Sequence, residues 1–159
     1  MSISIRPFNP GDAEVFLRVH HAAVRGIAAN DYSASIINAW APVIQAAHIE
    51  HVKADLTGER ILALSDGEVA GVGEVAPELS ELRACYVVPG FARKGIGRQI
   101  VAELEQIARS RGVLRLWVDS SLTAEAFYMR LGYSVRQRGE HILGNGIAMA
   151  CVTMEKTLQ

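Results

Sequence analysis

The apolar positions in the first third of the chain follow two different periods. Residues 3–8 alternate between apolar and polar side chains, which predicts a first strand that stops at the Pro-Gly pair behind it. Beyond that pair the apolar residues recur at helical spacing. Asp12 is placed to cap one helix, and Ser33 is placed to cap a second helix that ends near Pro42. Residues 43–52 predict a further helical segment.

The middle of the chain predicts a meander of strands followed by a long helix. Three strand-like runs come first, at residues 60–65, 68–76 and 81–88. Asp66-Gly67, between the first two runs, is the signal of a tight hairpin turn. After a glycine-containing turn, apolar residues recur at helical spacing from Ile96 onward, and Gly112 suits the C-terminal cap of that helix.

The last third combines strands with one short helix. Strands are expected at residues 113–119, 133–138 and 147–154, and a helix at residues 123–131. The connection at residues 139–146 contains the turn signal Asn145-Gly146. This order predicts a mixed α/β fold, with a largely antiparallel central sheet and helices on both faces. No repeat or linker divides the chain, so residues 1–159 are expected to form a single domain.

Composition narrows the classes of partner. Apolar residues make up 50% of the chain and charged residues 21%, which predicts a folded protein. The 16 basic and 17 acidic residues leave a net charge of -1, which argues against a general nucleic-acid-binding surface. No signal peptide and no apolar run of membrane-spanning length is present, so we expect a cytoplasmic protein with no membrane partner.

The sequence contains few candidates for a disulfide or a metal site. Cys85 and Cys151 both lie in apolar strand-like runs. Two buried free thiols in a reducing compartment are expected, and a disulfide is the alternative. His48 and His51 with Glu50 suggest a metal, but no third ligand follows at a suitable spacing, so no metal site is expected.

The turn before the long helix carries the clearest chemical signal. Gly95 and Gly97 remove side chains where backbone N–H groups can face an anion, and a helix that starts there directs its dipole at the turn. Arg93, Lys94 and Arg98 add positive charge at the same place. The combination suits a phosphate or pyrophosphate, and a basic surface turn is the alternative. The fingerprints of ATP-binding and dinucleotide-binding loops are absent, which disfavours a regulatory nucleotide-binding module.

Two motifs in this order resemble those of the GNAT acetyltransferase superfamily. Residues 92–97, Ala-Arg-Lys-Gly-Ile-Gly, are similar to the family turn Gln/Arg-x-x-Gly-x-Gly/Ala, which holds the pyrophosphate of acetyl-coenzyme A. Residues 121–128 are similar to the family motif Asn-x-x-Ala-x-x-x-Tyr, and Gly132-Tyr133 to the Gly-Phe/Tyr that follows it. The resemblance covers residues 60–157 well.

The resemblance implies an N-acetyltransferase that uses acetyl-coenzyme A as co-substrate. The acetyl group would pass to an amine of a small molecule or a protein by direct attack in a ternary complex. The residues that the pattern assigns to the co-substrate are Cys85, Val87, Arg93, Lys94, Gly95, Ile96, Gly97, Arg98 and Ser121. Two positions depart from the pattern. Ala92 stands where Gln or Arg is usual, which Arg93 partly replaces, and Ser121 stands where Asn is usual.

The strand at residues 81–88 is expected to supply an oxyanion hole. Alternation places Glu81, Arg83, Cys85 and Val87 on one face, and Leu82, Ala84, Tyr86 and Val88 on the other. In proteins of the resembled family a bulge near the position of Cys85 to Val87 splays this strand. Backbone N–H groups exposed there would face the thioester carbonyl.

Glu81 and Tyr128 are the catalytic residues that the resemblance implies. By its spacing from Gly95, Glu81 matches the general-base glutamate of the histone-acetylating branch, since an ammonium of pKa roughly 10 must lose a proton before attack. Glu74 and Glu78 compete for this role, and a solvated edge carboxylate is the alternative for Glu81. Tyr128 matches the tyrosine that donates a proton or hydrogen bond to the leaving thiolate, with simple packing as its alternative.

Other candidate residues have plainer interpretations. His20-His21 directs its rings to opposite sides of a helix and is expected at the surface, whereas His141 lies in a loop where it can face substrate. Cys85 has no histidine partner for a ping-pong route and is interpreted as structural. Tyr32 and Trp40 suit pocket walls or core packing, and core packing is expected.

Specificity for the acceptor is expected to reside in residues 12–53 and 139–146, which carry no readable signal for one amine. The acceptor, the use of other acyl groups and a homodimer stay open. The alternative function is a non-catalytic acyl-coenzyme A sensor or partner-binding domain on the same fold. The departures at Ala92 and Ser121 leave this alternative open.

Overall fold

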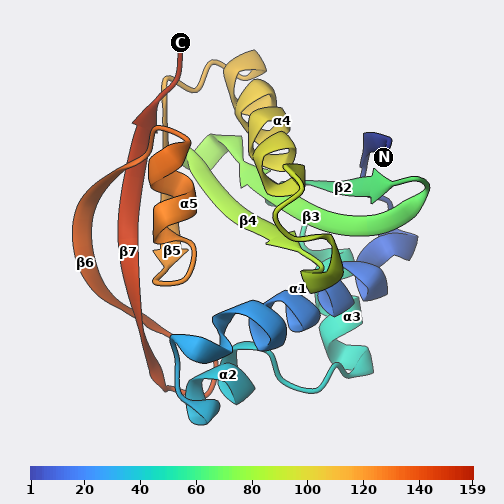
Figure 1. The fold of residues 1–159 in the computed structure, drawn as a ribbon, viewed down its shortest axis with the longest axis vertical. Helices are drawn as coiled ribbons and strands as arrows, with labels where there is room; N and C mark the ends of the chain where they lie inside the picture. The colour runs from blue at the N-terminus through green and yellow to red at the C-terminus, as the bar shows by residue number, and fades with distance from the viewer.

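Seven strands form one sheet in the order β1-β2-β3-β4-β5-β7-β6, in a computed structural model that describes residues 1–159 (Figure 1). The strands are β1 (Ile3–Pro7), β2 (Glu59–Ser65), β3 (Glu68–Ala76), β4 (Glu81–Val87), β5 (Arg115–Ser121), β6 (Ser134–Ile142) and β7 (Ala148–Thr157). The helices are α1 (Ala13–Ile27), α2 (Ala34–Trp40), α3 (Ala46–Ala54), α4 (Ile96–Ser110) and α5 (Glu125–Arg130). All neighbouring strands run antiparallel except β4 and β5. The predicted mixed, largely antiparallel sheet is confirmed.

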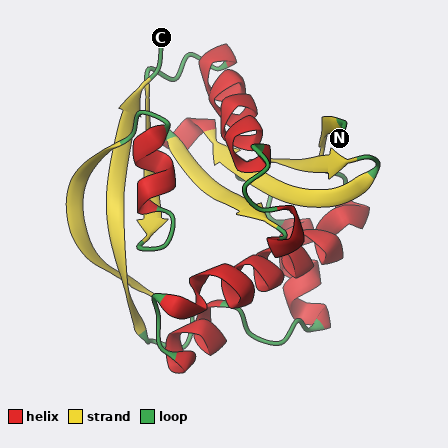
Figure 2. Ribbon diagram, in the orientation of Figure 1, coloured by secondary structure: helices red, strands yellow, loops and turns green.

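The helices form two groups, α1 to α3 and α4 with α5 (Figure 2), which cover opposite faces of the sheet. Glycines on β3 let α4 lie close, because a Cβ at Gly71 or Gly73 would come within 2.7 or 2.5 Å of Ile100. Val72, between these glycines, points to the opposite face and packs with Phe16 of α1. None of the helices combines the length and the apolarity that crossing a bilayer needs.

The face under α4 and α5 carries the main core. It buries 17 apolar residues in one cluster, against 7 and 5 in the two clusters under α1 and α2. Side chains such as Ile100 and Leu104 of α4 are fully buried, and each contributes about 1.5–3 kcal/mol of hydrophobic stabilisation. The start of α4 is therefore firmly anchored, whereas the helices on the opposite face rest on smaller clusters.

β4 and β5 pair only at their beginnings. The parallel ladder joins Glu81 to Trp117 and Leu82 to Val118, and no further pairs follow. Beyond these residues the two strands diverge, so the sheet divides into one arm of β1 to β4 and another of β5 to β7 (Figure 1). The backbone of β4 past Leu82 thereby has one unpaired edge.

The bulge in β4 lies earlier than predicted, and the predicted alternation is wrong across it. The register between β3 and β4 shifts so that Arg83 is unpaired, between Leu82 opposite Val75 and Ala84 opposite Glu74. Leu82 is buried in the α4 core and Ala84 in the α1 core, which strict alternation would place on one face. The extra residue lets both be buried, and it shifts Ala84 and all residues of the strand after it one position relative to Glu81 and Leu82, while the predicted alternation from Ala84 to Val88 holds.

The last hairpin is longer than predicted. β6 continues to Ile142, so the connection to β7 is residues 143–147 rather than 139–146. His141 pairs with Met149 of β7 and lies in a strand, not in a loop. Pairing of residues 137–142 with β7 overrides the loop predicted to begin at Gly139.

Of the two predicted helix caps, Ser33 is confirmed and Asp12 is wrong. Ser33 caps α2, because its hydroxyl accepts a hydrogen bond from the Ile36 N–H at 3.3 Å. Asp12 precedes α1 but does not cap it with its side chain. Its carboxylate instead accepts from the Asn9 N–H at 2.7 Å and pairs with Arg6 at 2.8 Å, which ties the start of α1 to β1.

Candidate active site

The divergence of β4 and β5 opens a cleft of about 220 Å³ between the two arms. Side chains of both arms and of the helices on both faces line it. They include Trp40, Glu81, Arg83, Cys85, Tyr86, Asp119, Ser121, Tyr128, His141, Met149 and Cys151. Four residues predicted from the sequence motifs thus meet in one cleft: Glu81, Cys85, Ser121 and Tyr128.

The free edge of β4 presents hydrogen-bond donors to this cleft. Val88 donates its N–H to Ala70 of β3 at 2.8 Å. Successive residues of an antiparallel strand direct their N–H groups to alternate edges. The N–H groups of Val87 and Cys85 therefore point away from β3, towards the diverging β5. At a rise of about 3.3 Å per residue these two donors lie roughly 6.7 Å apart, so one of them, and not both, can bind a single developing oxyanion.

The turn at the start of α4 has the geometry of an anion site. Gly95 adopts φ +82°, in the left-handed region, and the first intrahelical bond joins Gln99 N–H to the Gly95 carbonyl at 3.1 Å. The N–H groups of Ile96, Gly97 and Arg98 lie ahead of that bond and have no intrahelical partner. The exposed cations of the turn are Arg93, Lys94 and Arg98. Donors, helix dipole and cations together fit a pyrophosphate.

Gly97 connects this turn to the cleft. A Cβ at this position would come within 3.2 Å of the Phe127 ring and 3.6 Å of Val87. The Cys85 thiol lies 3.6 Å from the Gly97 carbonyl oxygen. The absence of a side chain thus lets the first turn of α4 pack against β4 and α5, so that the anion site adjoins the open strand edge.

Tyr128 lies deep in the cleft, with 5% of its surface exposed. Its ring packs edge-on against Phe127 and Tyr133, at centroid distances of 5.1 and 5.5 Å. Burial raises the pKa of Tyr128 well above its ordinary value, and the nearby Cys85 adds to the effect. The phenol therefore stays protonated and acts as a donor at neutral pH.

Ser121 has a local role at the mouth of α5. Its hydroxyl accepts a hydrogen bond from the Ala124 N–H at 3.1 Å, which closes the turn between β5 and α5. Ser121 also pairs with Cys151 at the end of the β5–β7 ladder. The side chain therefore holds the turn that brings α5 over the cleft.

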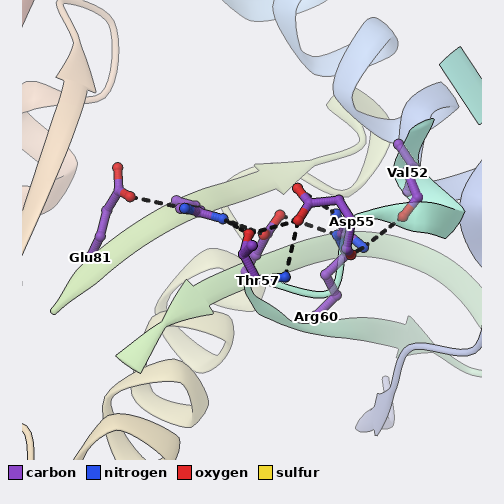
Figure 3. Close-up of polar contacts among 7 residues, drawn as sticks. Val52, Asp55, Thr57, Arg60 and Glu81 are labelled. Carbon is purple, nitrogen blue, oxygen red and sulfur yellow. Dashed lines mark hydrogen bonds and ion pairs between the residues drawn. The ribbon is translucent and has the colours of Figure 1, made fainter. Parts of the chain in front are cut away.

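Glu81 is held by an ion-pair network that runs away from the cleft (Figure 3). Arg83 donates from Nε to Glu81 at 3.0 Å and from Nη1 to the Thr57 hydroxyl at 2.6 Å. Alternation through the buried Leu82 directs Arg83 to the same side as Glu81, which accounts for this contact. The only hydrogen bond to the Glu81 carboxylate is at Oε1, and the side chain lines the cleft.

Glu74 ends this network in the interior. It is only 7% exposed, pairs with Arg60 at 3.2 Å and lies 3.6 Å from Arg83. Arg60 also donates to the carbonyls of Val52 and Asp55, each at 3.0 Å. Neither Glu74 nor Glu78 lines the cleft, so among the three competing carboxylates only Glu81 faces it.

The wall opposite Glu81 carries a second carboxylate that the sequence did not single out. Asp119 of β5 lies 3.7 Å from the Nδ1 atom of His141 on β6. Alternation along β5 places Asp119 on the opposite face from the buried Leu116 and Val118, and this pattern is readable in the sequence. Nothing in the sequence shows that this face borders Glu81.

Both cysteines are free, as predicted. Burial raises the pKa of the Cys85 thiol to about 12. Burial, and then a hydrogen bond to Asp119, raise the pKa of the Cys151 thiol to about 12. Since the thiolate is the nucleophile, both residues are unreactive at neutral pH, which supports the structural interpretation of Cys85.

The predicted surface position of His20 is wrong. Its ring packs against Tyr86 at a centroid distance of 4.7 Å and against Trp40 at 6.0 Å, between α1 and β4. Tyr86 and Trp40 in turn line the cleft, so His20 supports its aromatic wall from behind. Helical spacing placed the two histidines on different sides of α1 but did not show that β4 covers one of them.

Burial makes the stability of this wall depend on pH. It lowers the pKa of His20 from 6.5 to about 4, with a smaller effect from His21. Between these pH values the unfolded chain binds a proton that the folded chain does not, so stability falls as the pH drops through this window. We expect the free energy of unfolding to fall by about 2–3 kcal/mol from this residue between pH 7 and roughly pH 4.5. Urea unfolding of the wild type and of His20→Gln at both pH values measures it, and equal losses in the two proteins contradict it.

Tyr32 connects the segment between α1 and α2 to the arm formed by β5 to β7. Its hydroxyl donates to the Ala150 carbonyl at 2.6 Å and accepts from the Leu122 N–H at 2.7 Å. Thr123 adds a hydrogen bond to Asp31 at 2.7 Å. The short segment between α1 and α2 is thereby tied to β7 and to the turn after β5, which closes one end of the cleft.

His48 and His51 lie apart from the cleft. His48 accepts a hydrogen bond from the Gln45 N–H at 3.1 Å through Nδ1, which caps the start of α3. His51 lies in the last turn of the same helix and is exposed. The structure contains no group of three or more His, Cys, Asp or Glu side chains arranged to hold a metal ion.

A family model described as an acetyltransferase (GNAT) domain matches residues 28–158. The chain belongs to the GNAT acetyltransferase family. The matched residues include most of the sheet and all the residues that line the cleft. The match confirms the resemblance seen in the two motifs.

Individual GNAT proteins are similar over nearly the whole chain. The spermidine N(1)-acetyltransferase of Thermoplasma acidophilum is 25% identical over 151 residues, which cover 85% of this chain and 90% of that protein. A GCN5-related N-acetyltransferase structure from Rhodopseudomonas palustris has a TM-score of 0.91 at 30% identity and covers 99% of this chain and 97% of that one. The PaiA N-acetyltransferase of Thermoplasma acidophilum, solved with coenzyme A, has a TM-score of 0.72 at 22% identity and covers 99% of both chains.

Proposed function

We propose that this GNAT chain is an acetyl-coenzyme A-dependent N-acetyltransferase that acts by direct attack of an amine in a ternary complex. The observation that carries the proposal is the meeting of complementary groups in one cleft. The Cys85 N–H on the free edge of β4, the Tyr128 phenol and the Glu81 carboxylate all lie at it. Each charge and proton of acetyl transfer has a matching group among them.

Acetyl-coenzyme A would supply the acetyl group as an activated thioester. The residues that would hold its pyrophosphate are those of the turn: Arg93, Lys94, Gly95, Ile96, Gly97 and Arg98. Cys85, Val87 and Ser121 would border the pantetheine arm. The left-handed Gly95 and the open space around it support this assignment, because the backbone there can approach an anion closely.

Glu81 would take the proton from the acceptor ammonium, directly or through a water molecule. An ammonium with a pKa of about 10 is almost wholly protonated at neutral pH and has no lone pair for attack. The hydrogen bond from Arg83 to Oε1 fixes the Glu81 side chain and leaves Oε2 to accept that proton.

One N–H group of this strand edge, that of Cys85 or that of Val87, would stabilise the negative charge that grows on the thioester oxygen during attack. Tyr128 would donate a hydrogen bond to the leaving sulfur and pass on its proton as charge develops there. The raised pKa of Tyr128 supports the role of donor, because the phenol enters the reaction protonated.

A non-catalytic acyl-coenzyme A sensor is the second candidate, because Arg83 already occupies one oxygen of the proposed base. Two measurements separate the candidates: calorimetric titration with coenzyme A, and thiol release from acetyl-coenzyme A across a panel of amines. The enzyme predicts binding and amine-dependent thiol release. Binding without release supports the sensor, and no binding contradicts both.

Tyr128→Phe is expected to lower kcat about 100-fold, since it removes the donor to the leaving sulfur and keeps the packed ring. The KM for acetyl-coenzyme A is expected to stay within about twofold, because the pyrophosphate site is untouched. The control is Tyr133→Phe, whose hydroxyl donates to the buried Glu105 at 2.9 Å and does not line the cleft. It removes the same atom, so an equal loss of kcat in the two variants contradicts the role of Tyr128.

A further inference from the structure

The charged side chains that line the cleft are not all paired with a group of opposite charge. Its charged side chains are Glu81, Arg83 and Asp119. Arg83 contacts two carboxylates, at 3.0 Å from Glu81 and 3.6 Å from Glu74, and its remaining bond goes to Thr57. The single guanidinium of the cleft is therefore paired, through Nε and Nη1, with groups on the Glu81 side.

Asp119 on the opposite wall has no permanently charged partner. Its one basic neighbour within 4 Å is His141, at 3.7 Å, an imidazole whose charge is not permanent. The Cys151 thiol beside it is protonated and neutral. The Asp119 side chain is 32% exposed, so a ligand in the cleft can reach it.

Aromatic side chains line the same cleft. Trp40 and Tyr86 both line it, with ring centroids 6.5 Å apart and planes inclined at 64°. His20, packed against Tyr86, and Tyr32, packed against Trp40, hold the two rings in place. An organic cation is favoured beside aromatic faces and a carboxylate, because both carry negative potential towards it.

We infer that the acceptor is a small organic cation with a second positively charged group besides the amine that is acetylated. Asp119, with the rings of Trp40 and Tyr86, binds that second group while Glu81 deprotonates the reacting amine. This inference rests on the proposed function and names its substrate class. It also disfavours free amino acids, since a carboxylate in the cleft would face Asp119 and Glu81, and the one guanidinium there is already paired with two carboxylates.

The experiment compares three kinds of acceptor on one carbon chain: an α,ω-diamine, the monoamine, and the ω-amino acid. It is run over several chain lengths at saturating acetyl-coenzyme A. For the best length, kcat/KM for the diamine is expected to exceed that for the monoamine by about 10-fold, and the amino acid is expected to be the poorest. In Asp119→Asn the preference for diamine over monoamine is expected to fall to within about twofold. Glu68→Gln, which removes an exposed carboxylate of the β2–β3 hairpin, is the control and keeps the preference.

The outcomes separate this inference from the proposed function. Amine-dependent thiol release without preference for the diamine overturns the inference and leaves the acetyltransferase standing. A preference that survives in Asp119→Asn overturns the assigned subsite. Coenzyme A binding with thiol release from other amines, but none from any diamine, also overturns the inference. Failure to bind coenzyme A overturns the proposed function itself.

Discussion

Gly95→Glu is expected to lower the affinity for acetyl-coenzyme A at least ~100-fold, a loss of about 2.7 kcal/mol. Gly95 has φ +82°, where a side chain costs about 1 kcal/mol or more, so the turn is expected to distort. The added carboxylate also lies at the positive end of α4, where it competes with the pyrophosphate for the same N–H groups. Calorimetric titration with coenzyme A measures the effect.

The matched control is Gly112→Glu at the other end of α4. Gly112 has φ +77°, and like Gly95 it has no atom within 4 Å of an added Cβ. The substitution therefore brings the same charge and similar backbone strain without touching the proposed pyrophosphate site. Unchanged affinity in Gly95→Glu, or an equal loss in both variants, contradicts the assignment of the turn.

Glu81→Gln is expected to lower kcat/KM for the acceptor at neutral pH by about 10²–10³-fold. Without a base, only the small fraction of acceptor already present as free amine reacts. The rate of the variant should therefore rise about tenfold per pH unit towards the pKa of the amine, roughly 10, and the deficit should shrink. Initial rates of thiol release from pH 7 upward, at saturating acetyl-coenzyme A, measure both effects.

Glu78→Gln is the control for this variant. Glu78 lies in the short turn Pro77–Leu79 just before β4 and does not line the cleft. It loses the same charge near the same strand, and its rate and pH profile are expected to match the wild type. A Glu81→Gln profile parallel to that of the wild type would assign the base to another group. Glu74→Gln is a poorer control because it breaks a buried pair with Arg60, and removing one partner of a buried pair destabilises the fold.

Elements governed by local chemistry were predictable from the sequence. Asp66-Gly67 forms the predicted hairpin turn, with positive φ at both residues. The helical spacing from Ile96 corresponds to α4, which ends just before Gly112 at φ +77°. Each of these depends on backbone preferences within a few residues, so neighbouring sequence carries the information.

The wrong predictions share a dependence on distant packing. The bulge lies at Arg83 because Leu82 and Ala84 must be buried under different helices, and this requirement comes from α4 and α1. His20 is partly buried because β4 brings Tyr86 against its ring. Local periodicity contains neither fact, since it describes one element and not its partners.

For this protein, the sequence by itself determined the basic glycine turn before α4 and the motif carrying Tyr128, because both are contiguous segments whose backbone geometry and charge follow from adjacent residues. Only the tertiary structure decided which groups share the cleft. It buried Glu74, left Glu81 facing the opening, and brought Asp119 to the opposite wall. The physical reason is that β4 and β5 diverge after two paired residues, and this divergence depends on the whole sheet and on the helices packed against each arm.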